Sequence, residues 1–227
     1  MQLNTREEKK MIFQKKDMTI TKGEKIFTNI DEIDKIFIKE IATDILFLPT
    51  EKQELKILYQ ENKIEKYDIS FENNVVLVKK LVPEKKIKFT YDKLTRLIVY
   101  IPKKMNISIE NISSNVDIRI KEVKKLHVET VSGFIKTKNL VADKLFIDSV
   151  SGNIELIPFK ADNIEIKTVS TNVILGIDDI EQNYNIHSEK VLKNIFIEQN
   201  TNKHIDLKTI SGTFKLEFLR SKMDIKK

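Results

Sequence analysis

Serines recur at a fixed spacing in the second half of the chain, in the segments VETVSGFIKT, IDSVSGNIEL and IKTVSTNVIL. Ser132, Ser151 and Ser170 follow one another at equal intervals along the chain. A hydrolase nucleophile is a single residue with a base within hydrogen-bonding reach. A serine that returns at a constant interval is instead typical of a corner in a repeated structural unit.

The apolar residues around these serines repeat with the same period. Counted from Val150, they lie at positions −5, −3, +4 and +6. The same template fits five further units, centred on Ile112, Val131, Val169, Val191 and Ile210, which together span residues 106–218. Apolar spacing of two indicates strands with one buried face, and a period of about twenty residues indicates stacked units. The sequence therefore predicts an all-β, parallel β-solenoid with 19-residue coils, in which the six units are stacked in the order in which they occur along the chain.

The corner of each predicted coil combines an apolar residue, a serine and a small residue. We expect Val150 and its equivalents to point inward and fill the turn. Serine and asparagine side chains can hydrogen-bond the backbone at such a bend. The predicted structural corners are Ser132, Gly133, Ser151, Gly152, Ser170, Ser211 and Gly212. A corner present in six copies predicts a scaffold and no catalytic residue.

The first hundred residues match the template only once, around Ile41, which predicts an outlying first coil. Residues 48–100 alternate apolar and polar residues in short runs, with Asn73-Asn74 at a predicted hairpin turn and Pro102 after the last run. We interpret them as an antiparallel elaboration that covers the N-terminal end of the solenoid, where strand edges would otherwise be bare.

The predicted organisation has three parts. A weakly patterned segment spans residues 1–35, where Thr5 and Glu8 form a weak capping-box pattern for a short helix. A single β-repeat domain follows over residues 36–218, with the antiparallel part at 48–100 and regular coils at 101–218. A basic tail covers residues 219–227.

Charge and cysteine content narrow the function classes. The net charge is +6, yet 40 basic residues are scattered among 34 acidic ones, so no nucleic-acid partner is predicted. The absence of cysteine excludes disulfides, thiolate metal sites and cysteine nucleophiles. The N-terminus lacks the apolar run of a signal peptide, and no run of eighteen apolar residues occurs. The chain as written is therefore expected in the cytoplasm, without a transmembrane segment; a missing upstream segment would reverse this.

Two sets of polar residues are weighed as metal sites. Glu110, Glu129 and Asp148 fall in one column of adjacent coils, which suits either a divalent cation or a solvated ladder relieved by nearby lysines. His127 and His187 share another column but stand about 14 Å apart at the parallel-strand spacing, too far for one ion. No cofactor is predicted, and the cation question stays open.

An outward apolar cluster is predicted at Ile157, Ile174 and Phe196. In the predicted coil order, Ile174 and Phe196 occupy adjacent coils of one outward column. Such a cluster either lies beneath another segment, for which residues 177–190 are long enough, or binds a protein partner or a second copy of the chain.

The segment VYIPKKMNISIENISSNVDI, followed by VETVSGFIKT and IDSVSGNIEL, resembles the bacterial "putative adhesin" family, a domain of unknown function with β-strand repeats. The likeness covers roughly residues 33–218. It implies a β-solenoid-like fold, no established enzymatic activity, and for some relatives a link to envelope stress in low-GC bacteria.

These observations favour a non-catalytic scaffold or interaction module, with peripheral envelope association as one setting. Two alternatives remain: a carbohydrate-active enzyme on a β-helix scaffold, and a protein that binds an anionic polymer through its lysines.

Overall fold

The computed structural model describes residues 20–63, 65–81, 96–178, 184–188 and 203–219. These residues form strands and one short 3-10 helix, η1 (Ile30–Glu32), and none of them lies in a helix that could span a membrane. The strands are β1 (Thr21–Phe27), β2 (Lys35–Glu40), β3 (Asp44–Pro49), β4 (Leu55–Glu61), β5 (Lys66–Glu72), β6 (Val75–Leu81), β7 (Arg96–Ile101), β8 (Asn106–Asn111), β9 (Val116–Ile118), β10 (Glu122–Thr130), β11 (Phe134–Thr137), β12 (Leu140–Ile177), β13 (Asn185–Ser188), β14 (His204–Thr209) and β15 (Thr213–Phe218). The all-β prediction is confirmed.

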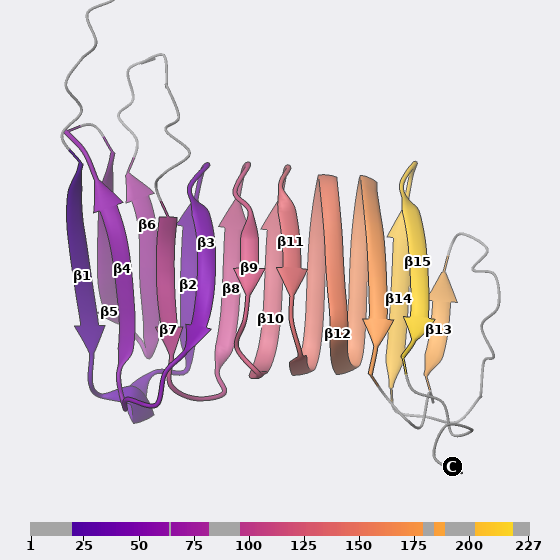
Figure 1. Ribbon diagram of the computed structural model, residues 1–227, viewed down its shortest axis with the longest axis horizontal. Helices are drawn as coiled ribbons and strands as arrows, with labels where there is room; N and C mark the ends of the chain where they lie inside the picture. Colours follow the sequence, from indigo (N-terminus) through magenta and orange to yellow (C-terminus); the bar gives the residue numbers. More distant parts are fainter. Residues whose placement is uncertain (1–19, 64, 82–95, 179–183, 189–202, 220–227) are drawn as a thin grey trace, which may run out of the picture.

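All fifteen strands belong to one long, mostly parallel sheet that folds back on itself. One layer contains β5, β6, β2, β8, β10, β14 and β13, and the other contains β1, β4, β7, β3, β9, β11 and β15 (Figure 1). The long β12 bends repeatedly and contributes to both layers (Figure 1). Corners that join the layers line up along the upper and lower edges in Figure 1.

Strand pairing in the middle of the sheet joins residues that are one sequence period apart. Leu126 in β10 pairs with Ile107 in β8 and with Leu145 in β12. In the other layer, Ile135 in β11 pairs with Val116 in β9 and Ile154 in β12. The apolar columns seen in the sequence therefore coincide with the hydrogen-bonded registers of parallel strands.

The core lies between the two layers and is filled mainly by isoleucine, leucine and valine. Along β10, Val123, Leu126 and Val128 are buried, while residues between them face outward. β-Branched side chains suit this pleated, half-buried surface. Stacking each column on the next removes one continuous apolar strip from water, which is the main stabilising term of such a stack.

The outlying first coil joins the regular ones. Ile36 in β2 pairs with Ile107, and Ile45 in β3 pairs with Val116, so β2 and β3 are neighbours of β8 and β9 although residues 50–105 separate them in the chain. From this intervening segment, β4, β5, β6 and β7 extend the stack at its N-terminal end.

The antiparallel part is smaller than the sequence predicts. β4 and β5 pair antiparallel with β7 and β6, and β1 pairs antiparallel with β4. However, β6 and β7 run parallel to β2 and β3, so they add another coil-like layer pair to the stack. The expectation that all of residues 48–100 are antiparallel is wrong in this respect, because alternation of apolar residues is the same in both kinds of pairing.

Two turn predictions are confirmed at this end. Asn73 and Asn74 have φ values of 50° and 64° between β5 and β6, the left-handed conformations that a two-residue hairpin needs. Pro102 follows directly after β7. The segment with Thr5 and Glu8 lies outside the described residues.

The N-terminal end is closed by aromatic side chains from both layers. The rings of Phe27 and Phe71 are 6.2 Å apart, and those of Tyr59 and Tyr67 are 5.5 Å apart. The edge strand β1 is charged and largely exposed, which discourages pairing with another chain. β1 lies within residues 1–35, the segment predicted to be weakly patterned, so part of that segment belongs to the sheet.

The coil order at the C-terminal end differs from the prediction. Ile164 in β12 pairs directly with Ile205 in β14, and Ile205 pairs on its other side with Ile186 in β13. The unit near Val191 therefore does not separate those of Val169 and Ile210. The pattern could not indicate this order, because every unit carries the same apolar template.

Candidate functional site at the corner ridge

The predicted structural corners lie along one edge of the sheet, the upper edge in Figure 1. The hydroxyl groups of Ser132, Ser151 and Ser211 donate hydrogen bonds to the backbone carbonyls of Ile112, Val131 and Val169, over 3.1–3.3 Å. Each bond links a corner to the neighbouring corner of the stack. Ser170 is exposed.

The glycines allow neighbouring corners to approach closely. Gly133 and Gly152 have φ values of 134° and 118°, a region that other residues rarely adopt. A Cβ atom on Gly152 would collide with the carbonyl oxygen of Gly133, and one on Gly212 would collide with that of Thr171. Glycine is therefore required by backbone contact between the corners.

The prediction that Val150 and its equivalents point inward is wrong. The exposed fractions are 52% for Ile112, 49% for Val131, 45% for Val150, 40% for Val169 and 78% for Ile210. Ile147 is buried, and alternation from it places Ser149 inside and Val150 outside. We call this row of five exposed apolar residues the corner ridge.

Polar residues occupy the inner positions that the apolar ones were expected to fill. The position before each ridge residue is buried and carries Asn111, Thr130, Ser149, Thr168 or Thr209. In the first coil, Glu40 is buried at the equivalent position. The Thr130 hydroxyl donates to the Oδ1 atom of Asn111 in the neighbouring corner over 2.8 Å, and the Thr209 hydroxyl accepts from the Gly212 backbone N–H over 2.9 Å. The Thr209 bond satisfies a backbone group that the turn would otherwise leave unpaired.

A charged column lies two residues before the ridge, on the same outward face. We call it the charged ladder; in stack order it consists of Lys39, Glu110, Glu129, Asp148, Lys167 and Lys208. The structure thus brings the predicted acidic column together. Lys39 Nζ lies 2.9 Å from Glu110 Oε2, and His127 Nε2 lies 3.2 Å from Glu129 Oε1. Within the described residues, no group of three or more acidic or histidine side chains is arranged to hold a metal ion.

Lys167 lies where the ladder changes sign. A hydrogen bond to Glu165 raises the pKa of Lys167, and the charges of Glu165, Asp148 and Asp206 raise it further. The lysine is therefore charged at neutral pH and neighbours Asp148 along the ladder.

The predicted apolar cluster is only partly described. Ile174 pairs with Lys215 in β15, which contradicts the predicted adjacency of Ile174 and Phe196. Phe196 itself lies outside the described residues. Ile157 is half-buried and packs over Gly176, where an added Cβ would lie 2.9 Å from its Cγ2 atom. A docking role for this cluster stays a prediction.

A buried ionic cluster joins the first coil to the N-terminal end, and no sequence prediction covered it. Glu40 in β2 accepts a 2.6 Å hydrogen bond from the Tyr67 hydroxyl and a 2.9 Å bond from the Ile41 backbone N–H. Lys80 Nζ lies 3.6 Å from Glu40 Oε1 and 3.1 Å from Glu65 Oε2. Burial raises the pKa of Tyr67, and the charge of Glu40 raises it further.

The signal for this cluster was present in the alternation. Glu40 continues the inward series of Ile36 and Ile38, and Lys80 continues that of Val76 and Val78. Two opposite charges in inward positions of separate strands indicate a buried pair, because an isolated buried charge would be too costly.

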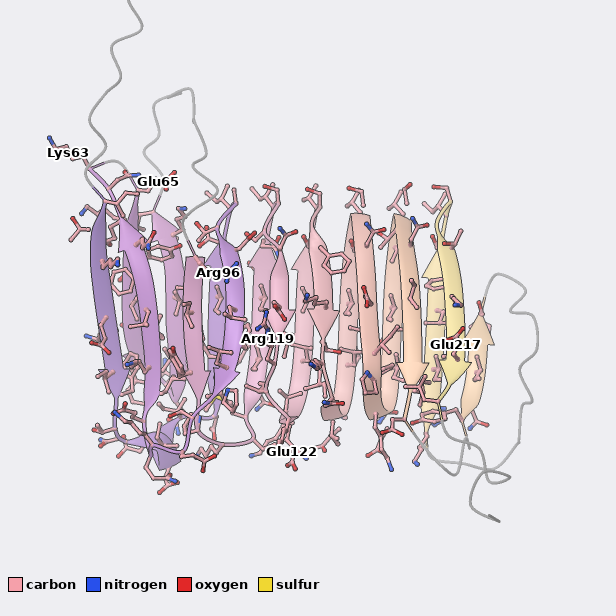
Figure 2. The ribbon with its side chains drawn as sticks, in the orientation of Figure 1. Lys63, Glu65, Arg96, Arg119, Glu122 and Glu217 are labelled. Carbon is pink, nitrogen blue, oxygen red and sulfur yellow. The ribbon has the colours of Figure 1, made fainter. Side chains whose placement is uncertain are left out.

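A shallow depression of about 200 Å³ lies on the outer face of the layer that contains β7, β3, β9 and β11. Arg96 and Lys136 contribute positive charge to it, and Asp44 and Asp117 contribute negative charge. Figure 2 shows Arg96 and Arg119 on this face, and the Arg119 Nη2 atom is 2.6 Å from Asp117 Oδ2. Because both signs of charge are present, this depression does not concentrate one charge for a substrate.

The fold and its corners define a class: an all-β protein in which short repeated strand pairs stack into a long, mostly parallel sheet. The family profile of "Toastrack DUF4097" matches residues 33–226. The chain belongs to this family, which confirms the resemblance found in the sequence. No curated protein sequence matches the chain.

Solved structures are similar to this chain at low sequence identity. A "putative cell adhesion protein" from Clostridium sporogenes is 12% identical, with a TM-score of 0.52 over 88% of this chain and 99% of that one. A "putative adhesin" from Bacteroides fragilis is 13% identical, with a TM-score of 0.47 over 88% of this chain and 97% of that one. The first likeness shows a common fold.

Proposed function

We propose that this protein is a non-catalytic interaction module, built as a parallel β-solenoid with 19-residue coils, that binds a partner through its corner ridge. The observation that carries the proposal is the exposure of five stacked apolar side chains along one edge, from Ile112 to Ile210. Exposed apolar surface that is contiguous marks an interaction site more often than scattered apolar residues do.

The chemistry of the corners supports a non-catalytic role. A nucleophilic serine needs a base that accepts its proton. The hydroxyl protons of Ser132, Ser151 and Ser211 are instead directed at backbone carbonyls, and the same arrangement recurs along the stack. This repetition is expected of a structural bond and not of a reaction centre.

The carboxylates give little support to the alternative of a carbohydrate-active enzyme. Glycoside hydrolysis uses two carboxyl groups that flank the bond to be broken. Glu110 and Glu129 lie side by side on an exposed face, and each has a neighbouring cation or histidine. The name of the Clostridium relative supports an adhesive role, and we extend the proposal to binding at a bacterial cell envelope.

The test compares the wild type with a ridge variant, Val131→Lys plus Val169→Lys, as bait for envelope fractions of the native host. We expect the ridge variant to lose the captured partner while its melting temperature stays close to that of the wild type. The matched control is Glu155→Lys, an exposed change away from the ridge. Equal capture by all three proteins, or cleavage of a glycan by the wild type, would contradict the proposal.

A further inference from the structure

The corner ridge is straight and regularly spaced, because each of its residues stands on the next coil of the stack. Backbone bonds hold neighbouring corners in register: the Ser151 N–H donates to the Val131 carbonyl over 2.9 Å, and the Ser211 N–H donates to the Val169 carbonyl over 2.8 Å. The Asn172 side chain donates a hydrogen bond to the Asn153 side chain, which links the coil of Val169 to that of Val150. At about 4.8 Å per coil, the five ridge residues span about 19 Å.

The charged ladder beside the ridge has an ordered pattern of sign. Three carboxylates, Glu110, Glu129 and Asp148, are followed by two cations, Lys167 and Lys208. Beside the five ridge residues, the ladder therefore changes sign once, between the coil of Asp148 and that of Lys167. A row of charges with one sign change becomes complementary to itself when a second copy is reversed about that point.

We propose that the corner ridge is the interface of a two-fold symmetric dimer, with the two ridges antiparallel and the dyad between Val150 and Val169. This inference rests on the proposed function and names a second copy of the chain as the partner. Val150 then faces Val169 of the second copy, and Val131 faces Ile210 of the second copy. A two-fold interface repeats each of these contacts by symmetry.

The same dyad aligns opposite charges on one side of the ridge. Asp148 faces Lys167 of the second copy, and Glu129 faces Lys208 of the second copy. A dyad at Glu129 is unfavourable, because it would place that carboxylate against itself and Glu110 against Asp148. Like charges brought together at an interface oppose association, so the ladder selects the register while the ridge supplies apolar contact.

The contact area sets the expected strength. Four ridge residues per copy, with their flanking side chains, bury a few hundred Å² on each side, which is at the small end for specific complexes. The dimer is therefore weak and concentration dependent, and an increase in salt weakens it because the aligned charges are exposed.

The test is sedimentation equilibrium of the purified chain, up to about 1 mM and at low and high salt. Glu129→Lys and Lys208→Glu are each expected to weaken the dimer about tenfold, because either change places two like-charged pairs across the dyad. The double variant Glu129→Lys plus Lys208→Glu reverses both charges and is expected to restore the dissociation constant to within about threefold of the wild type. Within one chain these two residues are about 14 Å apart, so a direct pair within the monomer cannot explain the rescue.

The side chains of Glu129 and Lys208 are 53% and 39% exposed, so all three variants are expected to fold, with thermal melts that match the wild type. A ridge variant, Val150→Ser plus Val169→Ser, is expected to abolish the dimer with little change in the melt. A wild type that stays monomeric at about 1 mM would overturn the dimer. So would two single variants whose defects add in the double variant. In either case, the proposed function would still hold if the ridge captures an envelope partner. If the protein neither dimerises nor captures a partner through the ridge, the proposed function is wrong as well.

Discussion

Replacement of Lys80 by methionine tests the buried ionic cluster at the N-terminal end of the stack. The Lys80 side chain is 5% exposed and that of Glu40 is fully buried. Methionine fills much of the space but leaves the Glu40 carboxylate without its buried cation. We therefore expect a large loss of stability from a change that removes only one charge.

The magnitude follows from the contacts of Glu40. Removal of one partner from a buried pair typically costs about 3–5 kcal/mol. Here the carboxylate also accepts bonds from Tyr67 and from the backbone N–H groups of Ile41 and Thr43, which stabilise its charge in the absence of lysine. We expect the lower end of that range, about 3 kcal/mol, which for a chain of this size lowers the melting temperature by about 6–12 °C.

The assay is urea unfolding monitored by circular dichroism, applied to a double-mutant cycle of Lys80→Met and Glu40→Met. The combined variant removes both charges, so its loss of stability should be smaller than the sum of the single losses by about 2 kcal/mol. If Lys80→Met costs less than about 1 kcal/mol, or if the two losses add, the buried pair does not stabilise the fold as argued.

Three further predictions concern the cluster, the core and the corners. Tyr67 has a folded-state pKa above its ordinary value of 10.0, so above pH 10 the unfolded chain releases the hydroxyl proton while the folded chain keeps it. The stability of the fold therefore falls with rising pH, by up to about 1.4 kcal/mol per pH unit. Between about pH 9 and pH 11, the urea midpoint should decrease less for Tyr67→Phe than for the wild type. Ile154→Asp should unfold the protein because Ile154 is 1% exposed, whereas Glu155→Lys, on the exposed face, should change stability by less than about 0.5 kcal/mol; equal melting temperatures would refute the assigned register. Gly152→Ala should cost about 3 kcal/mol, since its Cβ would meet the backbone of the neighbouring corner, against about 1 kcal/mol for Ser151→Ala; a neutral Gly152→Ala would show that the corners are not in backbone contact.

The sequence by itself determined the repeated part of this protein. Apolar residues at every second position and a constant period between units identified the strands and the columns that pair, such as Leu126 with Leu145. Period-two alternation also carries the direction of each side chain. The inward assignment of Val150 failed because residue type was given more weight than alternation, although Ile147 already placed Ser149 inside and Val150 outside.

Only the tertiary structure decided which units are neighbours where the period breaks. Ile164 could have paired with Ile186 or Ile205, because both carry the same apolar pattern, and β14 rather than β13 occupies that edge. Strand pairing is a contact between distant parts of the chain, and a shared pattern does not specify the partner. The same holds for Glu40 and Lys80: each strand alone shows one charge in an inward position, and their pairing follows from the parallel contact of β2 with β6.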